Sequence, residues 1–379
     1  MTSQHRPRNG TTRLLLSVFS VLLFSFQLSA ASALAVVRDI EQGSPDTVQE
    51  DAPALPAKPN IVVILIDDAA FMDLGVYGGE ARTPNIDALA RTGALFTNYR
   101  TSPLCSPSRA MLLTGIDAHR TGIATIPEVL PPEHVGMPGY TMSLEPGVLT
   151  IADRLKPLGY RTLMTGKWHL GSGDGDLPNS HGFDRSFALD ASGADNWEDK
   201  SYMPFYAEAP WYEDGEAAAL PEDFYSSEFI VSKMIEYLDA TEGTAPFLAY
   251  LAFQAVHIPV QAPGDVTGGY DGVYSDGWVA LQEKRWQRAK SLGLIPESAP
   301  QPAFHELMRD WNAIPAEKQR LFAARMQVNA AMLEAMDMHI GRLIDHLMST
   351  GAFDDTIFVV TSDNGPEPSD ADNPQMDLW

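Results

Sequence analysis

Uninterrupted runs of apolar residues mark the strands that we predict along this chain. Three such runs cover Ile61–Ile66, Phe247–Phe253 and Thr356–Val360, and a shorter one covers Thr162–Met164. Apolar runs without polar alternation are typical of strands buried on both faces of a parallel sheet. Because helical patterns separate these runs, we expect an α/β fold with a large, mostly parallel (mixed) central sheet that is flanked by helices on both faces.

Capping residues and helical spacing predict where the helices begin and end. Thr83 and Ser106 are expected as N-caps, because Pro84 and Pro107 suit the first helical position. Gly115 suits the end of the second of these helices. The predicted helices cover residues 84–95, 107–114, 151–158, 226–238 and 317–349. Residues 262–315, which are rich in Gly, Pro and Trp, are interpreted as an insertion over the active face.

The N-terminus has the pattern of a secretory signal peptide. An apolar run, Leu14–Leu28, follows three arginines and precedes the small residues Ala33-Leu34-Ala35. The run is short for a membrane anchor, which is the alternative interpretation. We therefore expect a signal peptide over residues 1–35, a flexible leader over 36–58 and a catalytic domain over 59–379. This predicts a secreted or periplasmic protein without stable membrane insertion after signal cleavage.

The net charge of the chain restricts its partners. The sequence has 26 basic and 50 acidic residues, a formal charge of −24. A protein that binds nucleic acid needs a basic surface, and this sequence contains no basic cluster, so we exclude nucleic acid as a partner. An anionic substrate would require a local positive pocket within this acidic protein.

Cys105 is the single cysteine, so it has no partner for an intramolecular disulfide. A buried structural thiol is the ordinary interpretation of such a residue. Two features favour a functional role: Cys105 lies at the predicted start of a helix, and Arg109 follows about one turn later. A helix N-terminus and a fixed cation together favour the binding of an anion.

Acidic residues follow two of the predicted strands. Asp67 and Asp68 come directly after the first strand, and Asp363 and Asn364 follow the last one. Ligands of open α/β sheets bind at the carboxyl ends of the strands. Four oxygen-bearing side chains at that edge predict a site for a hard cation such as Ca²⁺ or Mg²⁺.

Two long motifs resemble those of a known family. The first runs Cys105-Ser106-Pro107-Ser108-Arg109 and continues into Leu-Leu-Thr-Gly; the second is the Gly-Lys-Trp-His-Leu-Gly segment that ends at Gly171. Between about Pro59 and Pro366 the chain resembles the type I sulfatases of the alkaline-phosphatase-like superfamily, and is most similar to bacterial arylsulfatases of the Pseudomonas type. The resemblance implies that a formylglycine-generating enzyme oxidises Cys105 to Cα-formylglycine.

The resemblance also implies roles for individual residues. A Ca²⁺ ion, rather than Mg²⁺, is expected to bind to Asp67, Asp68, Cys105 (as formylglycine), Asp363 and Asn364. The expected catalytic residues are Cys105, Arg109, Lys167, His169 and His257. The hydrated formylglycine would attack sulfur, with His257 or Lys167 protonating the leaving oxygen and His169 acting as a base. The remaining candidate histidines are expected to be structural: His119, His181, His339 and His346.

The implied activity is hydrolysis of aryl sulfates to a phenol or alcohol and sulfate, with a small-molecule sulfate ester as the substrate. The alternatives are a phosphodiesterase or phosphonate monoester hydrolase of the same superfamily, and an inactive fragment. The family pattern continues with a second lysine and a Gly-Gly-x-Arg-x-Pro stretch, but no lysine follows Lys318 here. We therefore expect that the C-terminal subdomain is missing and that the chain is truncated.

Overall fold

The computed structural model describes residues 58–366, apart from residues 174, 203–207, 241–244 and 305–307. The predicted signal peptide and the leader up to residue 57 lie outside the described residues. Among the described helices, none is both long and apolar enough to cross a membrane.

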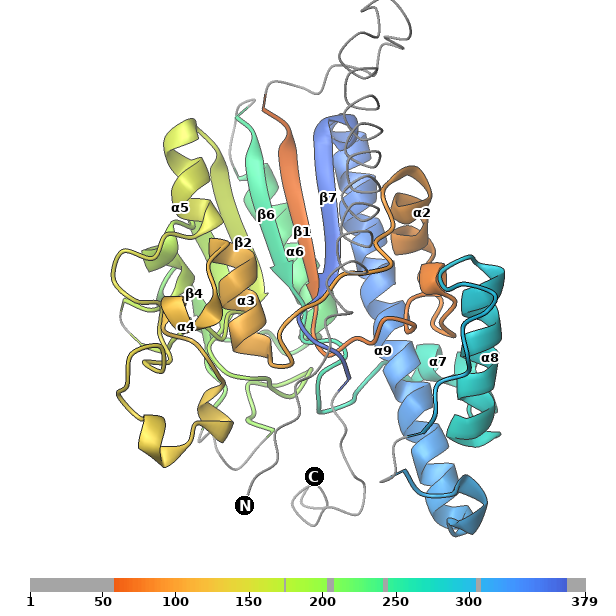
Figure 1. Ribbon diagram of the computed structural model, residues 1–379. Helices are drawn as coiled ribbons and strands as arrows, with labels where there is room; N and C mark the ends of the chain where they lie inside the picture. Colours follow the sequence, from red (N-terminus) through yellow and green to blue (C-terminus); the bar gives the residue numbers. More distant parts are fainter. Residues whose placement is uncertain (1–57, 174, 203–207, 241–244, 305–307, 367–379) are drawn as a thin grey trace, which may run out of the picture. The chain divides into compact units, whose positions relative to one another are not determined.

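The described strands form one seven-stranded sheet (Figure 1). Its spatial order is β5-β4-β3-β2-β6-β1-β7, in which β4 pairs antiparallel with both β3 and β5 and the other neighbouring strands pair parallel. The predicted mixed, mostly parallel sheet is confirmed. The strands are β1 (Asn60–Ile66), β2 (Arg161–Lys167), β3 (Arg185–Leu189), β4 (Trp211–Glu213), β5 (Glu216–Ala218), β6 (Phe247–Ala252) and β7 (Thr356–Ser362).

One strand is less buried than its sequence predicts. The apolar run of β7 was expected to be covered on both faces, but Ile357 and Val359 are 41% and 39% exposed. Phe358 and Val360, which alternate with them, pack against the core. The prediction was wrong because β7 is the edge strand of the described sheet and described helices cover one of its faces. A continuous apolar run does not reveal which strand lies at the edge.

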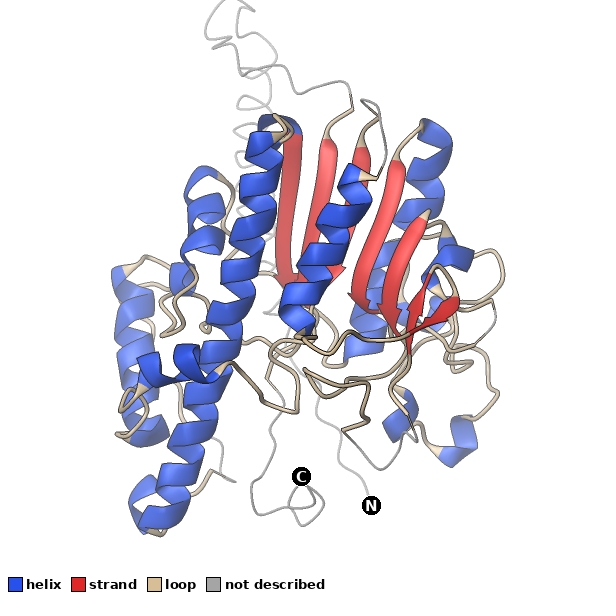
Figure 2. Cartoon of the chain, turned by 180° about the vertical axis from the view of Figure 1, so that it is seen from behind, coloured by secondary structure: helices blue, strands red, loops and turns tan. Residues whose placement is uncertain are grey.

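Helices cover both faces of the sheet (Figures 1 and 2). On one face, Ile230 and Met234 of α6 and Met336 of α9 pack into the larger core. On the other face, Leu113 of α3 and Ala152 of α5 pack into a second core. The α-helices are α2 (Pro84–Thr92), α3 (Cys105–Thr114), α4 (Ala118–Thr121), α5 (Ile151–Leu155), α6 (Ser226–Asp239), α7 (Gly264–Thr267), α8 (Gly277–Ser291) and α9 (Ala316–Ser349). Short 3₁₀ turns cover Gly75–Tyr77, Pro127–Val129, Pro132–His134, Lys156–Leu158, Pro178–His181, Gly268–Tyr270, Trp311–Ala313 and Phe353–Asp355.

Two predicted helix boundaries were wrong. Helix α2 ends at Thr92 instead of residue 95, because Gly93 leaves the helical conformation. Helix α3 begins at Cys105, with Leu104 in an extended conformation as its N-cap, and not at Pro107. Proline fits any position of the first turn, where backbone N–H groups have no intrahelical acceptor, so Pro107 did not identify the first residue. Cys105 itself is therefore the first residue of α3.

Residues 262–315 brace a loop next to β1. Arg285 of α8 donates to Asp73 at 3.0 Å and forms a second ion pair with Glu80. Asp73 also accepts a hydrogen bond from the backbone N–H of Ala70 at 2.8 Å. The segment thus holds the loop that directly follows Asp67 and Asp68.

Candidate active site

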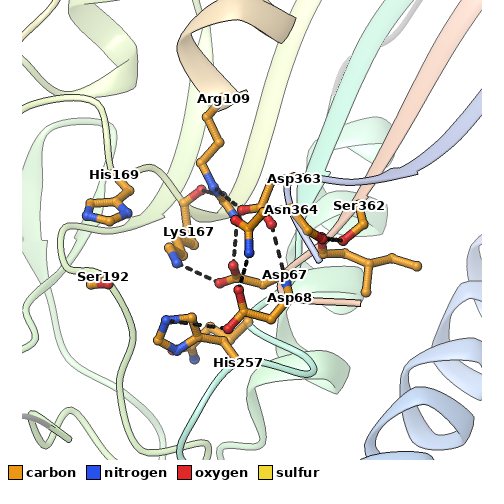
Figure 3. A network of polar contacts seen from close by, with 12 residues as sticks. Asp67, Asp68, Arg109, Lys167, His169, Ser192, His257, Ser362, Asp363 and Asn364 are labelled. Atoms are coloured by element: carbon orange, nitrogen blue, oxygen red, sulfur yellow. Dashed lines mark hydrogen bonds and ion pairs between the residues drawn. The ribbon is translucent and has the colours of Figure 1, made fainter. Parts of the chain in front are cut away.

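The acidic residues at the ends of β1 and β7 meet at one edge of the sheet (Figure 3). The two strands are parallel neighbours, with Ile66 opposite Ser362, so Asp67 and Asp363 follow at the same level. The backbone N–H of Asp68 donates to Oδ1 of Asp363 at 3.3 Å, and the Asn364 amide donates to Asp68. All four of these side chains are buried.

Cys105 lies beside this edge, at the N-terminus of α3. Its Sγ and one carboxylate oxygen each of Asp67 and Asp363 all lie within 4.8 Å of one another. The thiol is buried, with Cys105 6% exposed. The structure therefore brings together three segments that are far apart in the sequence.

Arg109 ties α3 to the acidic residues. Its side chain is fully buried, and its Nε and Nη2 lie 2.9 Å and 2.8 Å from Oδ2 of Asp363. Its Nη1 donates to the backbone carbonyl of Lys167 at 2.8 Å. Burial alone would lower the pKa of Arg109, but the carboxylates of Asp363 and Asp67 outweigh it and raise that pKa. Arg109 is therefore a permanent positive charge within the pocket.

Lys167 adds a second buried cation. Its Nζ donates to Oδ2 of Asp67 at 2.6 Å, and the side chain is inaccessible to solvent. Burial opposes its charge, but Asp67 raises the pKa of Lys167 overall. Burial and the neighbouring Asp67 raise the pKa of Asp363 to about 6. The pocket holds three carboxylates against two cations, so a divalent cation would reduce the repulsion between the acids.

Three oxygens in the pocket fit a hard cation. Oδ1 of Asp67, Oδ2 of Asp68 and Oδ1 of Asn364 are buried and accept no hydrogen bond from the described part of the chain. Buried polar atoms without partners are rare in native proteins, and carboxylate and amide oxygens are the ligands that Ca²⁺ and Mg²⁺ prefer. With Asp363 and position 105, these residues can supply the coordination of one such ion.

His169 borders the pocket on the side of β2. Both of its ring nitrogens are buried without a hydrogen bond from described residues, and Nε2 lies 3.8 Å from Oε1 of Glu128. Burial, followed by the positive charges of Lys167 and Arg109, holds the pKa of His169 well below its usual value. His169 is therefore neutral at neutral pH and can accept a proton.

His257 lies on the opposite side, close to Asp68 (Figure 3). Its Nδ1 is 2.6 Å from the carbonyl oxygen of Ile258, a contact that requires Nδ1 to carry the proton. Its Nε2 lies 3.9 Å from Oδ2 of Asp68 and faces the pocket. This nitrogen is placed to exchange a proton with a bound ligand.

Four other histidines lie apart from this cluster. His119 is exposed and meets Tyr140 edge-on, and His181 stacks on Trp168. His339 contacts Arg342, and His346 pairs with Asp239. These contacts agree with the structural roles expected for them.

Gly166 gives β2 the conformation that presents Lys167. Its φ of +105° is unfavourable for other residues, and a Cβ atom there would lie 1.9 Å from the carbonyl oxygen of Ala252 on β6. Replacing Gly166 with Ala is expected to destabilise the protein by roughly 2–4 kcal/mol, because β2 and β6 would have to move apart to accommodate the methyl group. Urea unfolding measures this free energy.

Gly147 offers a matched control for that substitution. Its φ is +86°, but a Cβ there would meet no atom within 4 Å. Gly147→Ala should therefore lose unfolding free energy only through its unfavourable φ, without a steric clash. Equal losses of unfolding free energy in the two variants would contradict the close approach of β2 and β6.

Sequence reasoning did not identify Glu128 as part of this region. It lies in the 3₁₀ turn Pro127–Val129, and its side chain is largely buried beside His169. No sequence motif surrounds Glu128. The turn lies beside the pocket because of how the loop after α4 folds back. Its position could be found only from the three-dimensional structure.

Comparisons with known proteins agree with this arrangement. Residues 59–377 match the sulfatase family. The chain is 38% identical over 319 residues to an arylsulfatase of Klebsiella aerogenes, covering 82% of this chain and 67% of that protein. It is also 38% identical over 325 residues to a sulfatase of Schizosaccharomyces pombe, covering 82% of this chain and 58% of the relative.

The fold is also similar to that of a solved structure. The structure of Ps i-CgsB superposes with a TM-score of 0.59 at 25% sequence identity, covering 82% of this chain and 59% of that one. The expected alkaline-phosphatase-like α/β architecture is confirmed. The chain thus spans between about three fifths and two thirds of the length of these proteins. Its family match and its identity to the bacterial arylsulfatase show that the chain belongs to the sulfatase family.

Proposed function

We propose that this protein hydrolyses sulfate monoesters, aryl sulfates among them, to a phenol or alcohol and inorganic sulfate. The observation that carries the proposal is the meeting of Cys105, Asp67 and Asp363 in one buried pocket with Arg109 and Lys167. A bound divalent cation, Arg109, Lys167 and the N-terminus of α3 would together give this acidic protein the local positive region that a sulfate ester requires, because the two side-chain cations alone do not balance the three carboxylates.

Cys105 is proposed to be the precursor of formylglycine. Burial, with the charge of Asp67 adding to it and Lys167 opposing it, raises the pKa of the Cys105 thiol. A buried, protonated thiol is a poor nucleophile, which argues against direct thiolate chemistry. Formylglycine at this position would supply a hydroxyl nucleophile in its hydrated form, and a bound Ca²⁺ would supply positive charge for the reacting oxygens. A maturation enzyme is the partner that this proposal requires.

Ca²⁺ is the proposed metal, with Mg²⁺ as the alternative. Asp67, Asp68, Asp363 and Asn364 would hold the ion together with position 105. All these ligands are oxygens, and Ca²⁺ accepts six to eight of them in flexible geometry.

The other residues of the pocket would bind the sulfate group and transfer protons. Lys167 and Arg109 hold negative charge on the sulfate group and fix the position of residue 105. His169, neutral because of its burial, accepts a proton near residue 105. With a proton on Nε2 as well as on Nδ1, His257 would donate to the leaving oxygen from the nitrogen that faces the pocket. We further propose that the protein acts outside the cytoplasm, after removal of residues 1–35.

Turnover of matched chromogenic esters tests the reaction class. With protein made in cells that carry the maturation enzyme, kcat/KM is expected to be larger for p-nitrophenyl sulfate than for p-nitrophenyl phenylphosphonate. Chelation of divalent ions should reduce turnover, and added Ca²⁺ should restore it, because the ion lowers the charge repulsion in the pocket. A preference for the phosphonate ester would instead indicate the phosphodiesterase class.

A further inference from the structure

A small cavity opens next to the candidate active site. Its volume is about 140 Å³. Its lining includes Ser106, which adjoins Cys105, and His169, so it is placed to receive the organic group of a bound ester. A cavity of about 150 Å³ can hold a benzene ring, so one six-membered ring fits here. The lining residues are Ser106, Ile123, Pro127, Met142, His169, Gly171, Ser172, Asp190 and Ala191.

The residues that line the cavity are of two chemical kinds, apolar and polar. Ile123, Pro127 and Met142 offer an apolar wall for a ring. Ser172 and Asp190 are polar, and the Ser172 hydroxyl donates a hydrogen bond of 2.8 Å to Oδ1 of Asp190. An ionised carboxylate can accept about four hydrogen bonds, so Asp190 keeps capacity for a ligand.

Unpartnered polar atoms also line this cavity. Ser106 is 1% exposed and His169 is 7% exposed, yet neither the Ser106 hydroxyl nor the His169 ring nitrogens have a hydrogen-bond partner among the described residues. Polar atoms that are buried in this way require partners from a ligand or from water. The cavity is therefore built to hold a molecule with both apolar and polar groups.

Asp190 gives the lining of the cavity a negative charge. Partial burial raises the pKa of the Asp190 carboxyl, and the hydrogen bond from Ser172 lowers it. A cation or a hydrogen-bond donor would gain from the Asp190 carboxylate, and an anionic group would be repelled.

Building on the proposed function, we propose that Asp190 determines which leaving groups are accepted. It selects esters whose leaving group is a single ring that carries a cationic or hydrogen-bond-donating substituent, and it excludes rings that carry a carboxylate or a second sulfate. The sulfate end of the substrate would be held by Arg109, Lys167 and the proposed divalent cation, so the two ends of the molecule are recognised by opposite charges.

Three aryl sulfates of matched shape test this inference: 4-(2-aminoethyl)phenyl sulfate, 4-ethylphenyl sulfate and 4-(carboxymethyl)phenyl sulfate. In the wild-type protein, kcat/KM should decrease in that order, by about tenfold or more between the ammonium and carboxylate esters. Asp190→Asn should bring this ratio close to one, since asparagine keeps an oxygen that accepts from Ser172 but has no charge. Asp117→Asn removes the same charge from an exposed helix cap, where asparagine caps equally well, and should leave the ratio unchanged.

The outcomes separate this inference from the proposed function. If all three esters are hydrolysed with equal kcat/KM by the wild-type protein, or if Asp190→Asn keeps the wild-type ratio, the role of Asp190 is wrong while sulfatase activity stands. If no ester is hydrolysed by matured protein, the proposed function is wrong and the inference falls with it. Because the order of the three esters is measured in the wild-type protein, the test does not depend on the folding of a variant.

Discussion

Replacing Cys105 with serine is expected to reduce the multiple turnover of p-nitrophenyl sulfate by roughly 10³-fold or more, because the reacting group is lost. Serine has nearly the shape of cysteine, so the pocket around Asp67, Asp363 and Arg109 should persist. A serine that attacked sulfur would form a sulfated side chain with no second hydroxyl on the same carbon to expel sulfate. Steady-state kcat measures the loss.

Two controls accompany this substitution. Met111→Leu changes a residue of the same helix with little change of volume, and turnover should stay near that of the wild-type protein. The thermal unfolding midpoint of Cys105→Ser should also stay close to the wild-type value, so that loss of folding does not explain the result. Unchanged turnover in Cys105→Ser would rule out formylglycine at this position.

Replacing Arg109 with methionine is expected to lower the free energy of unfolding by about 3–5 kcal/mol. Methionine fills a similar volume but leaves Asp363 without its buried cation, Asp67 with Lys167 as its only cation, and the Lys167 carbonyl without its donor. The large cost arises from the unpaired charges left in a dry pocket, not from the attraction within one ion pair. Urea unfolding, in the absence of Ca²⁺, measures it.

Arg82 provides the matched control for that variant. It pairs with Glu334 at 2.7 Å, but its side chain is 53% exposed, so water replaces the partner when it is removed. Arg82→Met should therefore cost at most about 1 kcal/mol. If the two arginine variants lost similar unfolding free energies, the buried ion pairs of Arg109 would stabilise the protein no more than an exposed pair, which would contradict this prediction.

Part of the fold and the meeting of the site residues could be predicted from local sequence. The apolar runs of β1 and β6 identified buried strands, and Asp67 and Asp363 directly follow two parallel neighbours. Cys105 and Arg109 are four residues apart on one helix, which places both side chains on the same face. These inferences succeed because they depend on strand ends and helical periodicity, which the sequence encodes within a few residues.

Other features depend on packing between distant segments and could not be predicted. The exposure of Ile357 and Val359 follows from the edge position of β7, which the apolar run does not encode. The start of α3 at Cys105 depends on the extended Leu104, whereas Pro107 fits several positions of a first turn. Asp190 lines the cavity only because the end of β3 lies next to β2, so its importance cannot be recognised from its neighbours in the sequence.

The most direct test of the account is the mass of the tryptic peptide Thr101–Arg109 from an enzymatically active preparation. We expect that the CH₂SH group of Cys105 has become an aldehyde, so that the peptide has the corresponding lower mass and reacts with hydrazides. An unmodified thiol throughout a preparation that hydrolyses p-nitrophenyl sulfate would contradict it.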